Sequence, residues 1–110
     1  MDGRLPLPAP TVLEAEDGFI DWEYTGPLTV RVAAYPSMAA NDVVTVHWES
    51  RAGRHDEPVR VSGAWVGAAL SARVPNRCLS SGSNKVSYTV ERFAGGVESS
   101  RTLLVNDRGR

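Results

Sequence analysis

Apolar and polar residues alternate strictly along several short segments of this chain, and this alternation constrains the fold more than any other feature. In segment 43–49, the side chains of Val44, Val46 and Trp48 fall on one face of an extended strand. The same period returns in segment 86–90. Because successive side chains of a strand point to opposite faces, each such segment predicts a strand with one buried face. The segments together predict a small β-sandwich.

The predicted strands follow one another at intervals of about ten residues, with turn-forming residues between them. They lie at 11–13, 19–22, 28–34, 43–49, 59–61, 70–74, 85–92 and 99–106. The Ala-Gly-Gly sequence at 94–96 predicts a hairpin turn. No long segment has the 3.6-residue period of a helix. The predicted fold class is therefore all-β, with about seven or eight antiparallel strands.

The length of 110 residues fits one domain. Residues 1–10 carry alternating prolines and are predicted to form an extended linker, followed by the domain at 11–106 and a polar tail at 107–110. Such a connector favours one domain of a longer chain that is exported to the cell surface or secreted. If the chain is complete as given, the lack of a signal pattern at its start instead predicts a cytoplasmic protein.

Charge and composition exclude several classes of partner. The net charge is −1 and the arginines are interleaved with acids, so the basic face typical of nucleic-acid-binding domains is missing. No apolar run approaches the length of about 20 residues that crosses a bilayer, so no membrane insertion is expected. The single cysteine, Cys78, rules out an internal disulfide.

Several core positions match the pattern of immunoglobulin-like sandwiches. Trp48 has the place of the core tryptophan on the third strand, and Tyr88 has that of the tyrosine two positions before the inter-sheet cysteine. Val90 then replaces this cysteine, and Val30 or Val32 replaces its partner. Tyr88 is either the tyrosine of a tyrosine corner or an ordinary strand aromatic. The fold expected is an immunoglobulin-like β-sandwich without a disulfide.

Longer stretches of the chain resemble the immunoglobulin-like repeats of large bacterial surface and adhesin-type proteins. They lie at 5–12, 35–48, 65–67, 70–75 and 86–92. The chain departs from the resemblance at Ser37 and Asn41, where such repeats often carry glycine. His47 and Cys78 also look particular to this chain.

The resemblance implies a non-enzymatic structural or adhesive module of a larger bacterial surface or secreted protein. Such repeats usually occur in tandem and project a binding tip from the cell. The expected partners are therefore neighbouring domains of the same chain, with a protein or a glycan as a candidate ligand. The alternative is a ligand-binding module that recognises carbohydrate or protein through its loops. No cofactor is expected in either case.

Groups with catalytic chemistry are few. His55 precedes Asp56, and such a pair could orient a general base. No nucleophile with a recognisable motif accompanies the pair, so no catalytic site and no enzyme activity are predicted. Cys78 is predicted to pack as a small apolar group under a loop.

Metal binding has a weak basis in the sequence. The only plausible ligands for a calcium ion in the linker are Glu14, Glu16, Asp17 and Asp107. No acidic loop of the calcium-binding type is present, because closely spaced aspartates are missing. No metal site is therefore predicted, and a linker calcium remains an alternative.

Partner contacts are expected at loops, where binding residues usually concentrate on a rigid sandwich. The candidate loops are 35–42, 51–56 and 76–83, and the candidate contact residues are Tyr35, Met38, Asn41, His55 and Trp65. Loop 35–42 and the 94–96 hairpin are predicted to be neighbours at one pole, with 51–56 at the opposite pole.

Four aromatic residues raise the question of stacking on a sugar or a protein, namely Trp22, Tyr24, Tyr35 and Trp65. The alternative is that aromatic rings cover the ends of the sandwich. For Trp22 and Trp65 we expect burial under loops, since large exposed aromatics are uncommon without a partner.

Overall fold

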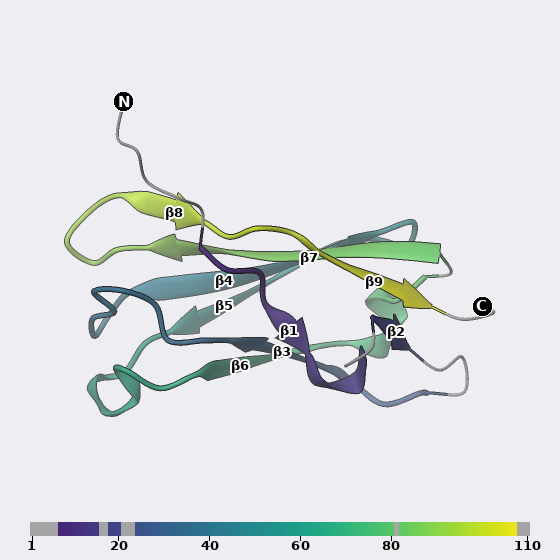
Figure 1. The fold of residues 1–110 in the computed structure, drawn as a ribbon, viewed down its shortest axis with the longest axis horizontal. Helices are drawn as coiled ribbons and strands as arrows, with labels where there is room; N and C mark the ends of the chain where they lie inside the picture. Colours follow the sequence, from purple (N-terminus) through teal and green to yellow (C-terminus); the bar gives the residue numbers. More distant parts are fainter. Residues whose placement is uncertain (1–6, 16–17, 21–23, 81, 108–110) are drawn as a thin grey trace.

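The alternating segments pair into two sheets that pack as a β-sandwich (Figure 1). The computed structural model describes residues 7–15, 18–20, 24–80 and 82–107. The smaller sheet has the strand order β1-β3-β6, made of Thr11–Val12, Leu28–Val32 and Leu70–Val74. The larger sheet has the order β2-β9-β7-β4-β5, and β8 pairs with β7. Its strands are β2 (Phe19–Ile20), β4 (Val43–Ser50), β5 (Gly53–Arg60), β7 (Gly82–Glu91), β8 (Val97–Ser99) and β9 (Leu103–Asp107). Three short 3-10 turns are η1 (Leu13–Ala15), η2 (Gly63–Trp65) and η3 (Asn76–Cys78).

This strand order is that of an immunoglobulin-like sandwich. Strands β1, β3 and β6 correspond to strands A, B and E of that fold, and β4, β7 and β9 correspond to C, F and G. The predicted fold class is therefore confirmed. Two details differ, because the described residues contain nine strands and β2 runs parallel to β9, with Phe19 opposite Asn106.

Strand β5 corrects the prediction of a polar loop at 51–56. Only Arg51 and Ala52 form the turn, and β5 then pairs with β4 over eight residues. The predicted strand at 59–61 overlaps only the end of β5. The rest of β5 has no strand signal, because it forms one edge of the sheet and carries polar side chains on both faces. Val61 N–H donates to the Asp42 carbonyl, so the backbone groups of Val61 point toward β4. Because these groups alternate between the two sides of a strand, the N atom of Pro58, three residues earlier, points toward the open edge. Proline and charged side chains at an edge prevent pairing with another chain.

The core lies between the two sheets, and the larger sheet contributes its aromatic centre. Trp48 on β4 is 0% exposed, and Tyr88 on the neighbouring β7 is also buried. The buried valines include Val30, Val32 and Val90, the residues expected in place of the inter-sheet cysteines. The Tyr88 hydroxyl makes no hydrogen bond to any residue that the structure describes, which favours an ordinary core aromatic over a tyrosine corner.

A buried asparagine that the sequence did not reveal supports this core. Trp48 Nε1 donates a hydrogen bond of 3.2 Å to Asn84 Oδ1. The Asn84 amide nitrogen donates to the carbonyl oxygens of Ser80, Gly82 and Val105. One fully buried side chain therefore links the core tryptophan to the start of β7 and to β9.

The connections gather at two poles of the sandwich (Figure 1). We call the end with Leu7 and the connections at 33–42, 61–69 and 92–96 the N-terminal pole. The opposite end, with the turn at 51–52, η3 and the end of β9, is the C-terminal pole. Leu7 is buried and forms a parallel bridge with Ser100. The part of the expected linker from Leu7 onward therefore lies against the domain.

Candidate functional site

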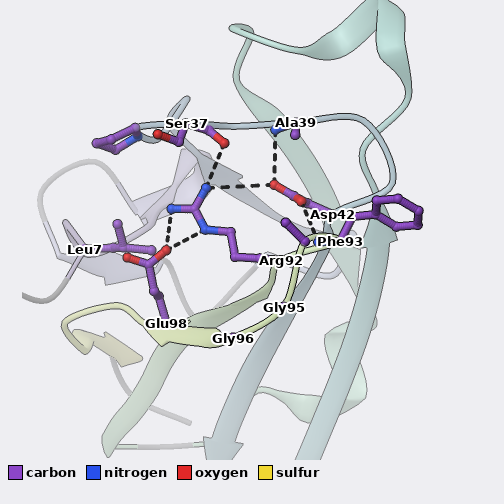
Figure 2. A pocket seen from close by; sticks show the side chains of 11 residues that line it. Leu7, Ser37, Ala39, Asp42, Arg92, Phe93, Gly95, Gly96 and Glu98 are labelled. Carbon is purple, nitrogen blue, oxygen red and sulfur yellow. Dashed lines mark hydrogen bonds and ion pairs between the residues drawn. The ribbon is translucent and has the colours of Figure 1, made fainter.

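The N-terminal pole brings together loop 35–42 and the β7–β8 hairpin, as the sequence predicted. Arg92 Nη1 donates to the Ser37 carbonyl at 2.9 Å, and Phe93 N–H donates to Asp42 Oδ1 at 2.9 Å. Figure 2 shows the Arg92 side chain reaching between Ser37, Asp42 and Glu98. The turn at 51–52 lies at the other pole, where Arg51 N–H donates to Ser80 Oγ in the 76–83 segment.

Asp42 is the buried centre of this pole, with a residue exposure of 1%. Besides Phe93, it accepts hydrogen bonds from the Tyr35 hydroxyl at 2.8 Å and from Ala39 N–H at 3.1 Å. Burial alone would raise the pKa of this carboxyl, but the three hydrogen bonds and the nearby Arg92 outweigh it and hold the pKa below its ordinary value. The same arrangement raises the pKa of the Tyr35 hydroxyl, through burial first and the Asp42 bond second.

Arg92 fixes the two loops to each other. Its guanidinium forms an ion pair with Glu98 across the hairpin and lies 4.9 Å from the centre of the Tyr35 ring. A guanidinium over an aromatic face is attracted by the ring quadrupole. Because Arg92 and Glu98 are both shielded from solvent, this pair holds the pole more firmly than an exposed surface pair would.

Three of the candidate contact residues serve the backbone or the core. Ser37 and Asn41 have φ angles of 59° and 72°, in the left-handed region that favours glycine. These are the positions where the resemblance expected glycine. Met38 is buried, and its sulfur accepts a hydrogen bond from Gly67 N–H at 3.4 Å. Tyr35 is buried as well, so neither Tyr35 nor Met38 offers a side chain to a partner.

An open hollow of about 580 Å³ lies between the two loops. Its polar floor is Asp42, Arg92 and Glu98, and apolar walls come from Leu7, Pro36, Ala39, Phe93 and Ala94. All three charged groups of the floor already have protein partners. The hollow can accept an apolar group, whereas the charged side chains of its floor already hold loop 35–42 and the β7–β8 hairpin together.

Large apolar side chains stand exposed around this pole. Phe93 at the hairpin is 72% exposed and Trp65 on η2 is 55% exposed, with Val66 beside it. The prediction that Trp65 is buried is wrong, because η2 lifts its ring over a small hollow of about 230 Å³ beside Val59 and Leu70. Trp22 lies outside the described residues, and Tyr24 is partly buried against the core.

His55 does not belong to a contact loop. It lies on β5 with its side chain partly buried, and its Nε2 is 3.1 Å from Glu57 Oε1. Asp56 follows it and points to the opposite face, where it contacts His47. The hypothetical His55–Asp56 pair is therefore absent, because adjacent residues of a strand face opposite sides.

Of the four acids considered as calcium ligands, the structure describes the side chain of Glu14 alone. Glu14 Oε1 accepts a hydrogen bond from Thr29 N–H at 2.7 Å, so it serves the fold. Glu16, Asp17 and the Asp107 side chain lie outside the described residues. In the described residues, no three His, Cys, Asp or Glu side chains are grouped to hold a metal ion. Cys78 is partly buried and packs against the core.

We expect the thermal midpoint to be indifferent to both a chelator and a reductant. The fold relies on apolar burial, and a single cysteine cannot form an internal disulfide. The measurement is a circular dichroism melt with and without EDTA, and with and without dithiothreitol. A drop with EDTA that calcium restores would contradict the prediction, because a bound ion stabilises the native state by mass action.

Comparisons with known proteins identify no family for this chain, because searches of protein-family models, curated proteins and solved structures found no match.

In the part of the chain that the structure covers, no helix has the length and apolar character needed to cross a membrane.

Proposed function

We propose that this chain is a non-enzymatic immunoglobulin-like module of a larger bacterial surface or secreted protein. In this proposal it is a structural or adhesive unit that sets the spacing between its neighbours. The supporting features are the sandwich topology and the resemblance to adhesin-type repeats. Its principal partners are then the neighbouring modules of the same chain.

The placement of the two chain ends carries the proposal. The chain enters beside the β7–β8 hairpin, where Leu7 N–H donates to Ser99 and Arg101 N–H donates to Leu7. It leaves through β9 at the C-terminal pole, where Asp107 is opposite Gly82 (Figure 1). Modules linked through opposite poles extend along one axis, which is the geometry of a rod.

The N-terminal pole also has the surface that a neighbour would need. Phe93, Trp65 and Val66 are exposed at this end, and the hairpin that carries Phe93 is anchored through Asp42 and Arg92. Exposed apolar groups on pre-ordered loops suit protein contact, because little conformational entropy is lost on binding. We therefore place the contact with the preceding module at this pole.

The test is a tandem protein of two copies joined through their own termini, studied by small-angle X-ray scattering. An extended particle with a narrow size distribution is expected. The double substitution Trp65→Ser and Phe93→Ser should broaden the distribution by loosening the contact. Leu104→Ser is the matched control, because Leu104 is 53% exposed but lies on β9, away from the N-terminal pole. Independent tumbling of both unsubstituted copies would contradict a module contact at this pole.

The second candidate is a ligand-binding module that recognises carbohydrate or protein. The observation favouring it is the half-exposed Trp65 ring beside Arg60 and Ser71, since an aromatic face with nearby polar groups suits a sugar. A glycan array with the single domain, followed by NMR titration, separates the two candidates. Chemical-shift changes confined to residues around Trp65 would favour the ligand-binding module.

A further inference from the structure

A chain of three polar side chains crosses the outer face of the larger sheet. His47 on β4 lies between Asp56 on β5 and Thr89 on β7. Its Nδ1 is 2.5 Å from Asp56 Oδ1, and its Nε2 is 3.0 Å from Thr89 Oγ1. A carboxylate, an imidazole and a hydroxyl thus follow one another at hydrogen-bond distance, in the order used to activate hydroxyl nucleophiles.

The sheet register explains why these groups meet. His47 is directly opposite Asp56, at a non-hydrogen-bonded pair of the ladder, where side chains approach most closely. Thr89 is opposite Thr45 and therefore diagonal to His47. This arrangement has little signal in the sequence, because its members come from three strands and Asp56 lies in the part of β5 that was predicted to be a loop.

The neighbouring charges determine which ring nitrogen carries the proton. Hydrogen bonds from His47 and then Arg54 lower the pKa of Asp56, so this carboxyl is ionised. A carboxylate at 2.5 Å requires a proton on Nδ1, even though Arg54 Nη2 lies 3.2 Å from the same nitrogen. Arg54 is accommodated by donating from Nε to Asp56 Oδ1 at 3.0 Å. In the neutral imidazole, Nε2 then accepts a hydrogen bond from the Thr89 hydroxyl.

We propose that Thr89 Oγ1 is a nucleophilic acceptor site for acyl groups from activated esters, with His47 as its base and Asp56 as a positioning residue. The oxygen attacks the ester carbonyl carbon and gives its proton to His47 Nε2. The new Oγ1–C bond forms, the bond from the carbonyl carbon to the leaving oxygen breaks, and His47 returns the proton to the alcohol or phenol that leaves. The product is an ester on Thr89.

The surroundings predict a single acylation rather than turnover. Tyr88 N–H donates to Ser100 Oγ. Backbone N–H groups alternate between the two sides of β7, so Thr89 N–H points toward β4, where Thr89 is paired with Thr45. Neither amide can stabilise an oxyanion, and loss of such a donor slows acyl transfer by about a hundredfold or more. Slow hydrolysis leaves the acyl group on Thr89. The proposal is thus compatible with a non-enzymatic module and does not depend on it.

The experiment treats the full chain with p-nitrophenyl acetate and measures acetylation of each site over time by peptide mass spectrometry. Thr45 is the internal control, since it faces Thr89 on the same surface without a hydrogen bond to a histidine among the described residues. Thr89 should be acetylated at least about tenfold faster than Thr45, and His47→Gln should remove most of this advantage, since a general base contributes about a hundredfold or more. Thr89→Ser should retain the reaction, and Thr89→Val should abolish it.

Asp56→Asn tests the positioning role separately. It should slow acetylation of Thr89 and shift the ¹⁵N resonances of the His47 ring toward the other tautomer, a signature that simple loss of stability would not produce. Circular dichroism and thermal melts establish that each variant is folded. Equal rates at Thr89 and Thr45, stable acetylation of His47 instead of Thr89, or a Thr89 rate unchanged in folded Asp56→Asn would overturn the proposal.

Discussion

Trp48→Ala should lower the free energy of unfolding by about 3–5 kcal/mol, the range for removing a large buried aromatic side chain. Trp48 is 0% exposed on β4 and is paired with Val86 on β7. Removing the ring leaves a cavity between the sheets. It also takes away the donor to Asn84 Oδ1, a fully buried acceptor. The cost therefore has an apolar part and a polar part.

Trp48→Phe separates these two parts. Phenylalanine fills much of the space but cannot donate to Asn84, so its cost beyond the volume change reports the hydrogen bond, about 1 kcal/mol. Urea denaturation followed by far-UV circular dichroism gives the free energies without relying on tryptophan fluorescence. Trp65→Ala is the matched control, because Trp65 is half exposed and should change stability by about 0.5–1 kcal/mol. A loss below about 1 kcal/mol for Trp48→Ala would mean that the strand register is wrong.

The strands that could be predicted from the sequence are those with one buried face. The alternations at 28–34, 43–49, 70–74 and 85–92 correspond to β3, β4, β6 and β7. Each of these strands buries every second side chain, so its sequence carries the period. At the edge, β5 carries polar residues on both faces, so a strand and a polar loop have similar composition. The predicted final strand at 99–106 is divided in the structure between β8 and β9.

The candidate site was predictable in its location and not in its chemistry. Topology placed loop 35–42 next to the 94–96 hairpin, and the contacts of Arg92 with Ser37 confirm this. The role of Asp42 had no local signal, since its donors come from Tyr35, Ala39 and the distant Phe93. A buried ionic network depends on residues about fifty positions apart. A single sequence contains no pattern that joins them.

The side-chain directions of the candidate contact residues could not be predicted from the sequence either. The loop positions of Tyr35 and Met38 predict partner contacts, yet both side chains turn inward and fill the end of the core. Trp65 was expected to be buried and is instead exposed on a 3-10 turn. Whether a loop aromatic turns inward depends on the space beneath the loop, which is set by residues elsewhere in the chain.

Asp42→Ala should cost about 3–5 kcal/mol at neutral pH, because removing a buried carboxylate leaves its hydrogen-bond donors without an acceptor and weakens its charge network. The Tyr35 hydroxyl and the N–H groups of Ala39 and Phe93 would lose their acceptor. Arg92 would keep Glu98 but lose the second carboxylate, which is 4.0 Å away. Urea denaturation of both proteins measures the loss. A cost similar to that of an exposed substitution, within about 0.5 kcal/mol, would contradict the role given to this carboxylate.

The dependence of this loss on pH follows from the direction of the Asp42 pKa. The folded-state pKa lies below the ordinary value of 3.8, so the unfolded state takes up a proton first as the solution is acidified. The stabilisation is therefore fully present above the unfolded-state pKa and is lost as pH falls through the folded-state pKa. Asp42→Asn preserves the shape of the side chain and removes this titration. The stability advantage of the native protein over Asp42→Asn should be largest near neutral pH and shrink below about pH 4.

The control for this pH profile is Asp56→Asn. Hydrogen bonds from His47 and Arg54 also lower the pKa of Asp56, but this carboxylate is half exposed and solvent screens its interactions. Its substitution should therefore leave most of the acid dependence in place, whereas Asp42→Asn should remove a larger share. If the two variants lose stability in parallel with the native protein between about pH 7 and pH 3, neither carboxylate drives the acid response. If Asp56→Asn alone flattens the profile, the acid-sensitive group lies on the outer sheet face instead of the N-terminal pole.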